Sequence, residues 1–144
     1  MFTGIVESVG KVTKVTKHIN LTTIQIDMGK MAARIKVGDS VSIDGVCLTV
    51  TQQKGKYLLF DAMKETLEKT CLGRLKLNSK VNVERALKAN ARLNGHFVMG
   101  HVDGKGKIKK IIRQKNYEEF HISTPRALMP YIVEKGSICV DGVS

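Results

Sequence analysis

The sequence has no tryptophan and few other aromatic residues, and this scarcity limits what its positive charge could serve. Phenylalanine and tyrosine make up 5% of the 144 residues, and they are not interleaved with the 24 lysines and arginines. A surface that binds single-stranded nucleic acid stacks bases on aromatic rings set among basic residues. The formal net charge of +11 therefore does not by itself indicate a nucleic-acid partner.

The strongest basic run extends from Lys105 to Lys115. In its first half, lysines alternate with glycine or isoleucine, which is typical of a strand with one solvated face. We therefore expect no nucleic-acid partner. A basic oligonucleotide-binding barrel is kept as an alternative, and salt-sensitive binding to single strands would favour it.

Cysteine is also scarce, and long apolar runs are absent. The three cysteines, Cys47, Cys71 and Cys139, are odd in number and have no C-x-x-C spacing. A reduced, cytoplasmic chain is the simplest interpretation. No basic region followed by an apolar run opens the chain, and no stretch has the length of a bilayer-spanning helix. We expect neither secretion nor a membrane partner.

The two prolines are outnumbered by valine, isoleucine and threonine, and the 13 glycines are spread between short segments. This composition favours an all-β fold. Six antiparallel strands without protected edges would close into a Greek-key barrel. The expected strands are Ile5–Thr16, Leu21–Met28, Val41–Asp44, Val46–Gln52, Tyr57–Ala62 and Val81–Arg85, with short helices at Gly29–Ile35 and at Met63–Leu72. In the second helix we expect Met63, Leu67 and Cys71 to form an apolar stripe.

Parts of the sequence occur twice, which predicts a duplicated domain. The segment from Gly4 to Glu7 resembles the segment from Gly100 to Asp103 at an offset of 96 residues, and Asp44-Gly45 returns as Asp141-Gly142 at an offset of 97. Chance similarity of short strands is the alternative. We expect a first barrel with its linker in residues 1–96 and the start of a second, homologous barrel in residues 97–144. Phe120–Ile122 would repeat the second strand, and Leu128–Val133 the first short helix.

Four segments, Met1–Glu7, Asp44–Val50, Asp61–Leu67 and Asn94–Gly104, together resemble the riboflavin synthase family of the alpha-chain type. The resemblance implies two similar six-stranded barrels, a C-terminal helix that assembles a trimer, and association with lumazine synthase. It also implies conversion of two molecules of 6,7-dimethyl-8-ribityllumazine into riboflavin and 5-amino-6-ribitylaminouracil, without metal or added cofactor. Each active site would lie between the first barrel of one subunit and the second barrel of its neighbour. Because the second barrel is incomplete here, this chain alone is not expected to complete an active site.

The resemblance also implies which residues bind the substrate. The first half-site would contain Gly4, Ile5, Val6, Cys47, Leu48, Thr49, Asp61, Ala62, Met63, Lys64, Glu65 and Thr66. The second would contain Gly100, His101, Val102, Lys135 and Ser144. Exposed strand backbone at Gly4–Val6 and Gly100–Val102 could pair with the edges of a pteridine. Ser40, Thr49, Asp61 and Thr66 could bind the ribityl hydroxyls, although each could instead be a satisfied turn or core residue.

His101, Cys47 and Ser144 are the catalytic candidates. His101 could carry a proton, since imidazole titrates near neutral pH, or it could be a structural histidine at a domain joint. Cys47 could be a nucleophile or a hydrogen-bond partner, but no base is adjacent in sequence, and a cysteine in an apolar strand is usually a small core residue. We expect Cys47 to belong to the pocket wall. His96 lies five residues from His101, on the opposite face of any strand, so we expect no metal pair. His18 and His121 belong to no motif.

Besides the basic oligonucleotide-binding barrel, which binding to single strands without flavin affinity would favour, two functions from different classes remain. One is the four-carbon transfer of a riboflavin synthase. The other is a non-catalytic lumazine- or flavin-binding protein of the same fold. Formation of riboflavin from the lumazine would distinguish them.

Overall fold

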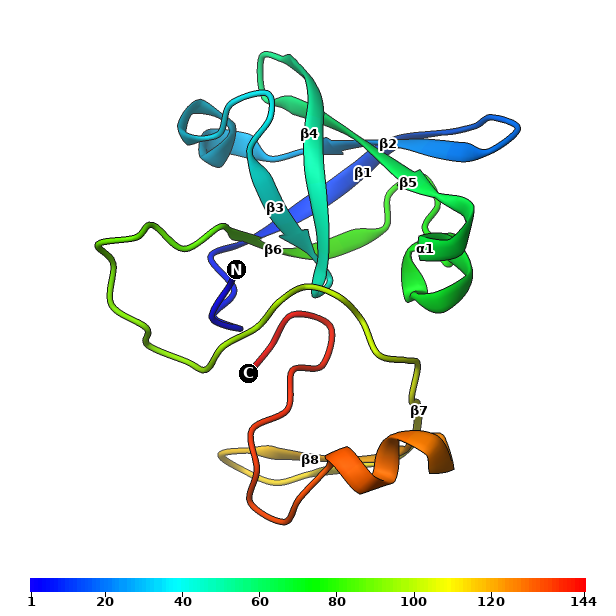
Figure 1. Cartoon of the computed structure of the whole chain (residues 1–144), viewed down its shortest axis with the longest axis vertical. Coiled ribbons are helices and arrows are strands. Elements are labelled where there is room, and N and C mark those ends of the chain that lie inside the picture. Colours follow the sequence, from blue (N-terminus) through cyan, green and yellow to red (C-terminus); the bar gives the residue numbers. More distant parts are fainter. The chain divides into compact units, whose positions relative to one another are not determined.

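The computed structural model describes residues 1–144 and divides into two compact units, the larger of which contains a closed six-stranded barrel (Figure 1). The larger unit comprises residues 1–102 and 137–144, and the smaller comprises residues 103–136. Around the barrel the strands follow the order β1-β2-β5-β4-β3-β6, and every neighbouring pair is antiparallel. The bounds are β1 Ser8–Lys17, β2 Leu21–Asp27, β3 Ser40–Ile43, β4 Val46–Lys54, β5 Tyr57–Met63 and β6 Lys80–Arg85. The predicted all-β barrel is confirmed.

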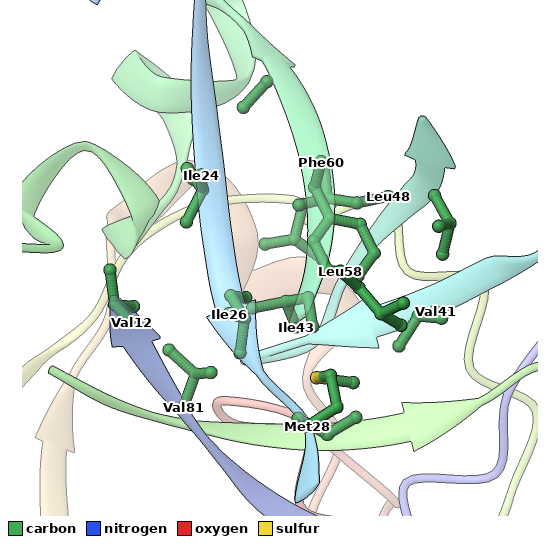
Figure 2. Packing of buried hydrophobic residues seen from close by; sticks show 14 of the residues in the cluster. Val12, Ile24, Ile26, Met28, Val41, Ile43, Leu48, Leu58, Phe60 and Val81 are labelled. Carbon is green, nitrogen blue, oxygen red and sulfur yellow. The ribbon is translucent and has the colours of Figure 1, made fainter. Parts of the chain in front are cut away.

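The barrel core is built from every second residue of each strand, because alternate side chains point inward. Ile24 and Ile26 of β2 lie opposite Phe60 and Leu58 of β5, and all four are at most 1% exposed. Figure 2 shows these side chains together with Val41, Ile43 and Leu48 inside the barrel. Fully burying one such side chain contributes about 1.5–3 kcal/mol. The intervening residues, such as Thr23, face outward, so the outer wall can carry polar groups.

Three short helices accompany the strands: the 3₁₀-helices η1 Gly29–Arg34 and η2 Cys71–Arg74, and the α-helix α1 Lys64–Lys69. The single predicted helix over residues 63–72 was wrong, because Thr70 interrupts it with an extended backbone at φ −122° and ψ 174°. The Thr70 hydroxyl donates to the Thr66 carbonyl and accepts from the Leu72 amide, an alternative to continued helical bonding. Of the predicted stripe, only Leu67 packs against the core, while Met63 and Cys71 are exposed.

The first strand begins later than predicted. Segment 4–6 is not extended strand, because Gly4 has a φ of 76°, and Gly100 likewise has a φ of 78°. The buried Glu84 carboxylate holds this segment, accepting from the Thr3 amide at 2.6 Å, the Thr3 hydroxyl at 2.7 Å and the Gly4 amide at 3.0 Å. The expectation of strand backbone at Gly4–Val6 and Gly100–Val102 was therefore wrong.

The smaller unit contains the antiparallel pair β7 Lys107–Arg113 and β8 Glu118–Ser123, and the 3₁₀-helix η3 Arg126–Tyr131. The predicted strand around Phe120 and the short helix near Leu128 are present. Ile108 and Phe120 of this two-stranded sheet are 54% and 50% exposed. No helix in the molecule is long and apolar enough to cross a membrane.

Candidate functional site

Strands β4 and β5 separate at one end of their ladder. The ladder stops at the pair Val50 and Phe60, next to a register shift, although both strands continue beyond that pair (Figure 1). Beyond it, residues 47–49 pair with β3 and residues 61–63 pair with β2, but these two segments do not pair with each other. We call this the β4–β5 opening. Backbone groups along an unpaired strand edge can hydrogen-bond a ligand.

Polar side chains line up across the outer wall on both sides of this opening. Ser40 lies opposite Thr49 in the β3–β4 ladder, and Thr23 lies opposite Asp61 in the β2–β5 ladder. The Thr23 hydroxyl donates to Asp61 Oδ1 at 2.6 Å. We call these four residues the polar row. It contains three of the four predicted ribityl partners, and Thr49 in it is exposed.

Three other predicted contacts near the opening differ in what they offer a ligand. Leu48 and Ala62 are 5% and 1% exposed, and Leu48 lies with the core side chains in Figure 2. Their side chains therefore face the core, and only their backbone can contact a ligand outside the barrel. Met63 is 57% exposed at the end of β5 and could cover a flat ring.

The site residues predicted in α1 mainly form ion pairs on the surface of the helix. Lys69 Nζ lies 2.6 Å from Glu65 Oε1, and Lys64 Nζ lies 3.9 Å from Glu68 Oε1. The bond from Lys69 lowers the pKa of the Glu65 carboxyl, so that this pair stays ionic. The Thr66 carbonyl accepts from the Thr70 amide and hydroxyl, and its side chain is half-buried.

The two predicted half-sites meet in crossed pairs within the larger unit. The Cys47 amide donates to the Gly100 carbonyl at 2.9 Å, and the Ser144 amide donates to the Gly4 carbonyl at 2.8 Å. Neither glycine could carry a side chain: a Cβ at Gly100 would lie 2.6 Å from Cys47 Cβ, and a Cβ at Gly4 would lie 2.7 Å from Ser144 Cβ. The structure therefore brings Cys47 to Gly100 and Ser144 to Gly4.

The two Asp-Gly turns also face each other. A Cβ at Gly45 would lie 2.8 Å from the Gly142 nitrogen. The Asn82 amide donates to Asp44 Oδ1 at 2.7 Å, and Asn82 Nδ2 donates to the Asp141 carbonyl at 3.0 Å. Burial raises the pKa of Asp44 to about 6; the bond from Asn82 opposes this shift, and the charge of Asp141 adds to it.

His96 and His101 have different surroundings. His96 Nδ1 lies 2.7 Å from Ser144 Oγ, so His96 is a functional candidate that the sequence motifs did not indicate. The two residues are 48 positions apart, and no local pattern relates them. His101 is exposed, and its ring makes no hydrogen bond to the protein.

The remaining predicted residues lie at three places. Ile5 is 46% exposed and Val6 is half-buried, both just before β1. Val102 is half-buried against the core of the larger unit. Lys135 belongs to the smaller unit, where its φ of 60° places it in a turn.

A cleft of about 560 Å³ lies beside β3, β6 and the linker after β6, rather than at the β4–β5 opening. Ile5 and Ser40 are the only predicted site residues that line it. Arg85 Nε and Nη2 each lie 2.8 Å from a Glu7 oxygen, and this bidentate bond lowers the pKa of Glu7. Because the lining mixes both signs of charge, the cleft has no clear preference for an anion. Its residues give no reason to place the pteridine there.

The sequence was compared with known proteins. Residues 3–86 and 99–144 match the model of the family described as "Lumazine binding domain". Over 144 residues the chain is 46% identical to riboflavin synthase from Actinobacillus pleuropneumoniae and 41% identical to that from Bacillus subtilis (strain 168). The chain belongs to the riboflavin synthase family. Each of these alignments covers all of this chain and 67% of the relative, so the chain spans about two thirds of a riboflavin synthase.

Solved structures with the same barrel include two of LumP. One is complexed with 6,7-dimethyl-8-ribityllumazine, with a TM-score of 0.88 and 25% identity, covering 99% of this chain and 77% of that chain. Another is complexed with riboflavin, with a TM-score of 0.92 and 24% identity, covering 99% and 78%. These likenesses agree with the fold, and the predicted resemblance to the riboflavin synthase family is confirmed.

Proposed function

We propose that this chain is the lumazine-binding part of a riboflavin synthase, which converts two molecules of 6,7-dimethyl-8-ribityllumazine into riboflavin and 5-amino-6-ribitylaminouracil. The observation that carries this proposal is the β4–β5 opening beside the polar row. A pteridine is flat and has amide-like edges, which backbone groups of residues 48–49 and 61–63 that face the opening can bind. The hydroxyls of the ribityl chain find partners in Ser40, Thr49 and Asp61.

The reaction requires two identical molecules to behave differently. One loses a proton from its C7 methyl group and later donates four carbon atoms, and the other accepts attack. A duplicated fold with unlike side chains at matching positions meets this requirement. Ile5 corresponds to His101, and Cys47 corresponds to Ser144, at the offsets of 96 and 97 residues found in the sequence.

Internal duplication, which we also propose, has further support in the backbone. The register shift in β1 lies between Val12 and Lys14, and the shift in β7 lies between Ile108 and Lys110, 96 residues later. The crossed bonds of Cys47 with Gly100 and of Ser144 with Gly4 are related by the same offsets. Each repeat thus supplies one glycine and one residue after an Asp-Gly turn.

In this proposal three side chains carry the chemistry, and no metal or cofactor takes part. His101 is exposed, and in this proposal it contacts a ligand held by a neighbouring subunit, where it would exchange the C7-methyl proton. Ser144, hydrogen-bonded to His96, would contact the ligand through its hydroxyl. Cys47 would line the first ring's pocket. A site shared between subunits requires an oligomer, for which we propose the expected trimer, in the cytoplasm, where the three free cysteines would stay reduced.

A non-catalytic lumazine- or flavin-binding protein is the second candidate. The 25% identity to LumP in its lumazine complex favours it. The higher identity of 46% to a riboflavin synthase favours the enzyme.

The decisive experiment incubates the full-length protein with 6,7-dimethyl-8-ribityllumazine and follows riboflavin by its absorbance. In parallel, quenching of ligand fluorescence measures binding. Riboflavin formation would support the enzyme, and tight binding without turnover or C7-methyl deuterium exchange would favour the binding protein. Absence of lumazine and riboflavin binding would overturn both.

A further inference from the structure

Asp61 is held in a defined orientation by two residues that belong to no sequence motif. Thr23 lies directly opposite Asp61 in the β2–β5 ladder, and its Oγ1 is 2.6 Å from Asp61 Oδ1. His18 Nε2 lies 3.3 Å from the same Thr23 oxygen. His18 is itself placed by the turn between β1 and β2, where its amide donates to the Leu21 carbonyl at 2.8 Å.

The direction of these hydrogen bonds follows from the groups involved. An ionised carboxylate only accepts, so the single hydroxyl proton of Thr23 must go to Asp61. His18 Nε2–H must then be the donor to Thr23 Oγ1. The two hydrogen bonds therefore point in one direction, from His18 to Thr23 and from Thr23 to Asp61, and Asp61 Oδ1 is occupied. Oδ2 makes no hydrogen bond to the protein, and it can accept one from a ligand hydroxyl.

We propose that Thr23 and His18 are positioning residues that orient Asp61 to bind a hydroxyl of the ribityl chain. This inference rests on the proposed function, because it concerns the same ligand. A carboxylate already held in its binding orientation loses less side-chain entropy when the ligand arrives. Thr23 also borders a recess of about 150 Å³ with Thr16 and Gln25, so this part of the outer wall is open beside it.

The test is Thr23→Val, which keeps the β-branched shape of a strand residue and removes the hydroxyl. Two ligands distinguish binding of the ribityl chain from binding of the flavin ring: riboflavin carries the ribityl group, and lumiflavin carries a methyl group in its place. We expect the variant to bind riboflavin roughly tenfold more weakly and lumiflavin as the wild type does, because one bond to a charged group is compromised. Thr13→Val is the matched control, since that hydroxyl binds only the Gln25 carbonyl, at 3.3 Å.

His18 allows a second, independent test. Gln can place a side-chain N–H near the position of His18 Nε2, whereas Leu cannot. We expect His18→Gln to bind riboflavin as the wild type does, and His18→Leu to bind it a few-fold more weakly, with lumiflavin unchanged in both.

The outcomes distinguish this inference from the function on which it rests. If the wild type binds riboflavin and Thr23→Val binds it equally well, the positioning role is rejected. Equal weakening of riboflavin and lumiflavin would assign Thr23 a merely structural role and would also reject it. If the wild type binds no flavin or lumazine, the proposed function itself fails, and the inference fails with it.

Discussion

At the scale of single residues, His101 is the proposed proton carrier. Its ring is exposed and makes no hydrogen bond to the protein, so a change there should disturb the fold little. In the full-length enzyme, we expect His101→Gln to keep lumazine affinity and to lower riboflavin formation roughly 100-fold or more, the usual scale of general acid–base catalysis. Deuterium exchange at the C7 methyl group should fall in parallel. Unchanged turnover would contradict the role, and His121→Gln, at another exposed histidine, is the matched control.

Asp44 should make stability depend on pH. Because burial raises its pKa from 3.8 to about 6, the folded state holds a proton that the unfolded state releases between these values. The contribution of Asp44 to stability is therefore largest below pH 4 and declines as the pH rises through about 6. Asn also tolerates the positive φ of 47° and can accept the Asn82 bond.

We thus expect Asp44→Asn to raise the melting temperature at pH 7.5 by roughly 2–5 °C, and the gain to shrink towards pH 4. Thermal unfolding at a series of pH values measures this. Asp103→Asn, at an exposed carboxylate, should show no such trend. A gain that grew on acidification would show that the sign of the Asp44 effect is wrong.

At the scale of elements, one carboxylate on β6 attaches the N-terminal segment to the barrel. Glu84 is 5% exposed and accepts all three of its hydrogen bonds from Thr3 and Gly4. In Glu84→Gln an amide donor must replace one acceptor oxygen, so at least one buried donor loses its partner. We expect the free energy of unfolding to fall by about 1–3 kcal/mol, measured by urea denaturation. Glu65→Gln, on the exposed face of α1, should change it little, and an equal loss in both would contradict the anchoring role.

The segment after the linker is packed onto β4 through Gly100. An alanine there would place its Cβ 2.9 Å from the Cys47 nitrogen and would also have to adopt a φ of 78°. We expect Gly100→Ala to destabilise the fold by about 2 kcal/mol or more in urea unfolding. Gly29→Ala is the control, because Gly29 has a positive φ of 55° but no neighbour within 4 Å, so only the backbone strain is added. Equal losses of stability in the two variants would show that the contact with Cys47 adds nothing to the cost of the backbone strain.

At the scale of the whole molecule, the two compact units should differ in stability. Strands β1 to β6 enclose one core, whereas β7 and β8 form a two-stranded sheet with Ile108 and Phe120 about half exposed. Two-stranded sheets are at best marginally stable. We expect amides of β2 and β5 to exchange orders of magnitude more slowly than those of β7 and β8 in native-state hydrogen exchange. The opposite order of protection would show that the barrel is not the stable unit.

The sequence by itself determined the strands, because alternation of apolar and polar residues gives each strand one face for the core. It determined the barrel class for the same reason, and the four motifs indicated the family. The ends of elements were less predictable. Gly4 has a φ of 76°, so β1 begins later in the sequence than predicted. The Thr70 side chain interrupts the predicted helix through hydrogen bonds that compete with those of the helical backbone.

Only the tertiary structure decided which site residues meet. Thr23 and Asp61 are 38 positions apart, and they meet because the β2–β5 register places them opposite each other. His96 and Ser144 are 48 positions apart and are joined by the return of the chain end to the Gly4 segment. The β4–β5 opening likewise depends on where a ladder stops. Register, strand separation and chain return are set by barrel closure and packing, which act between distant residues and leave no local periodicity to read.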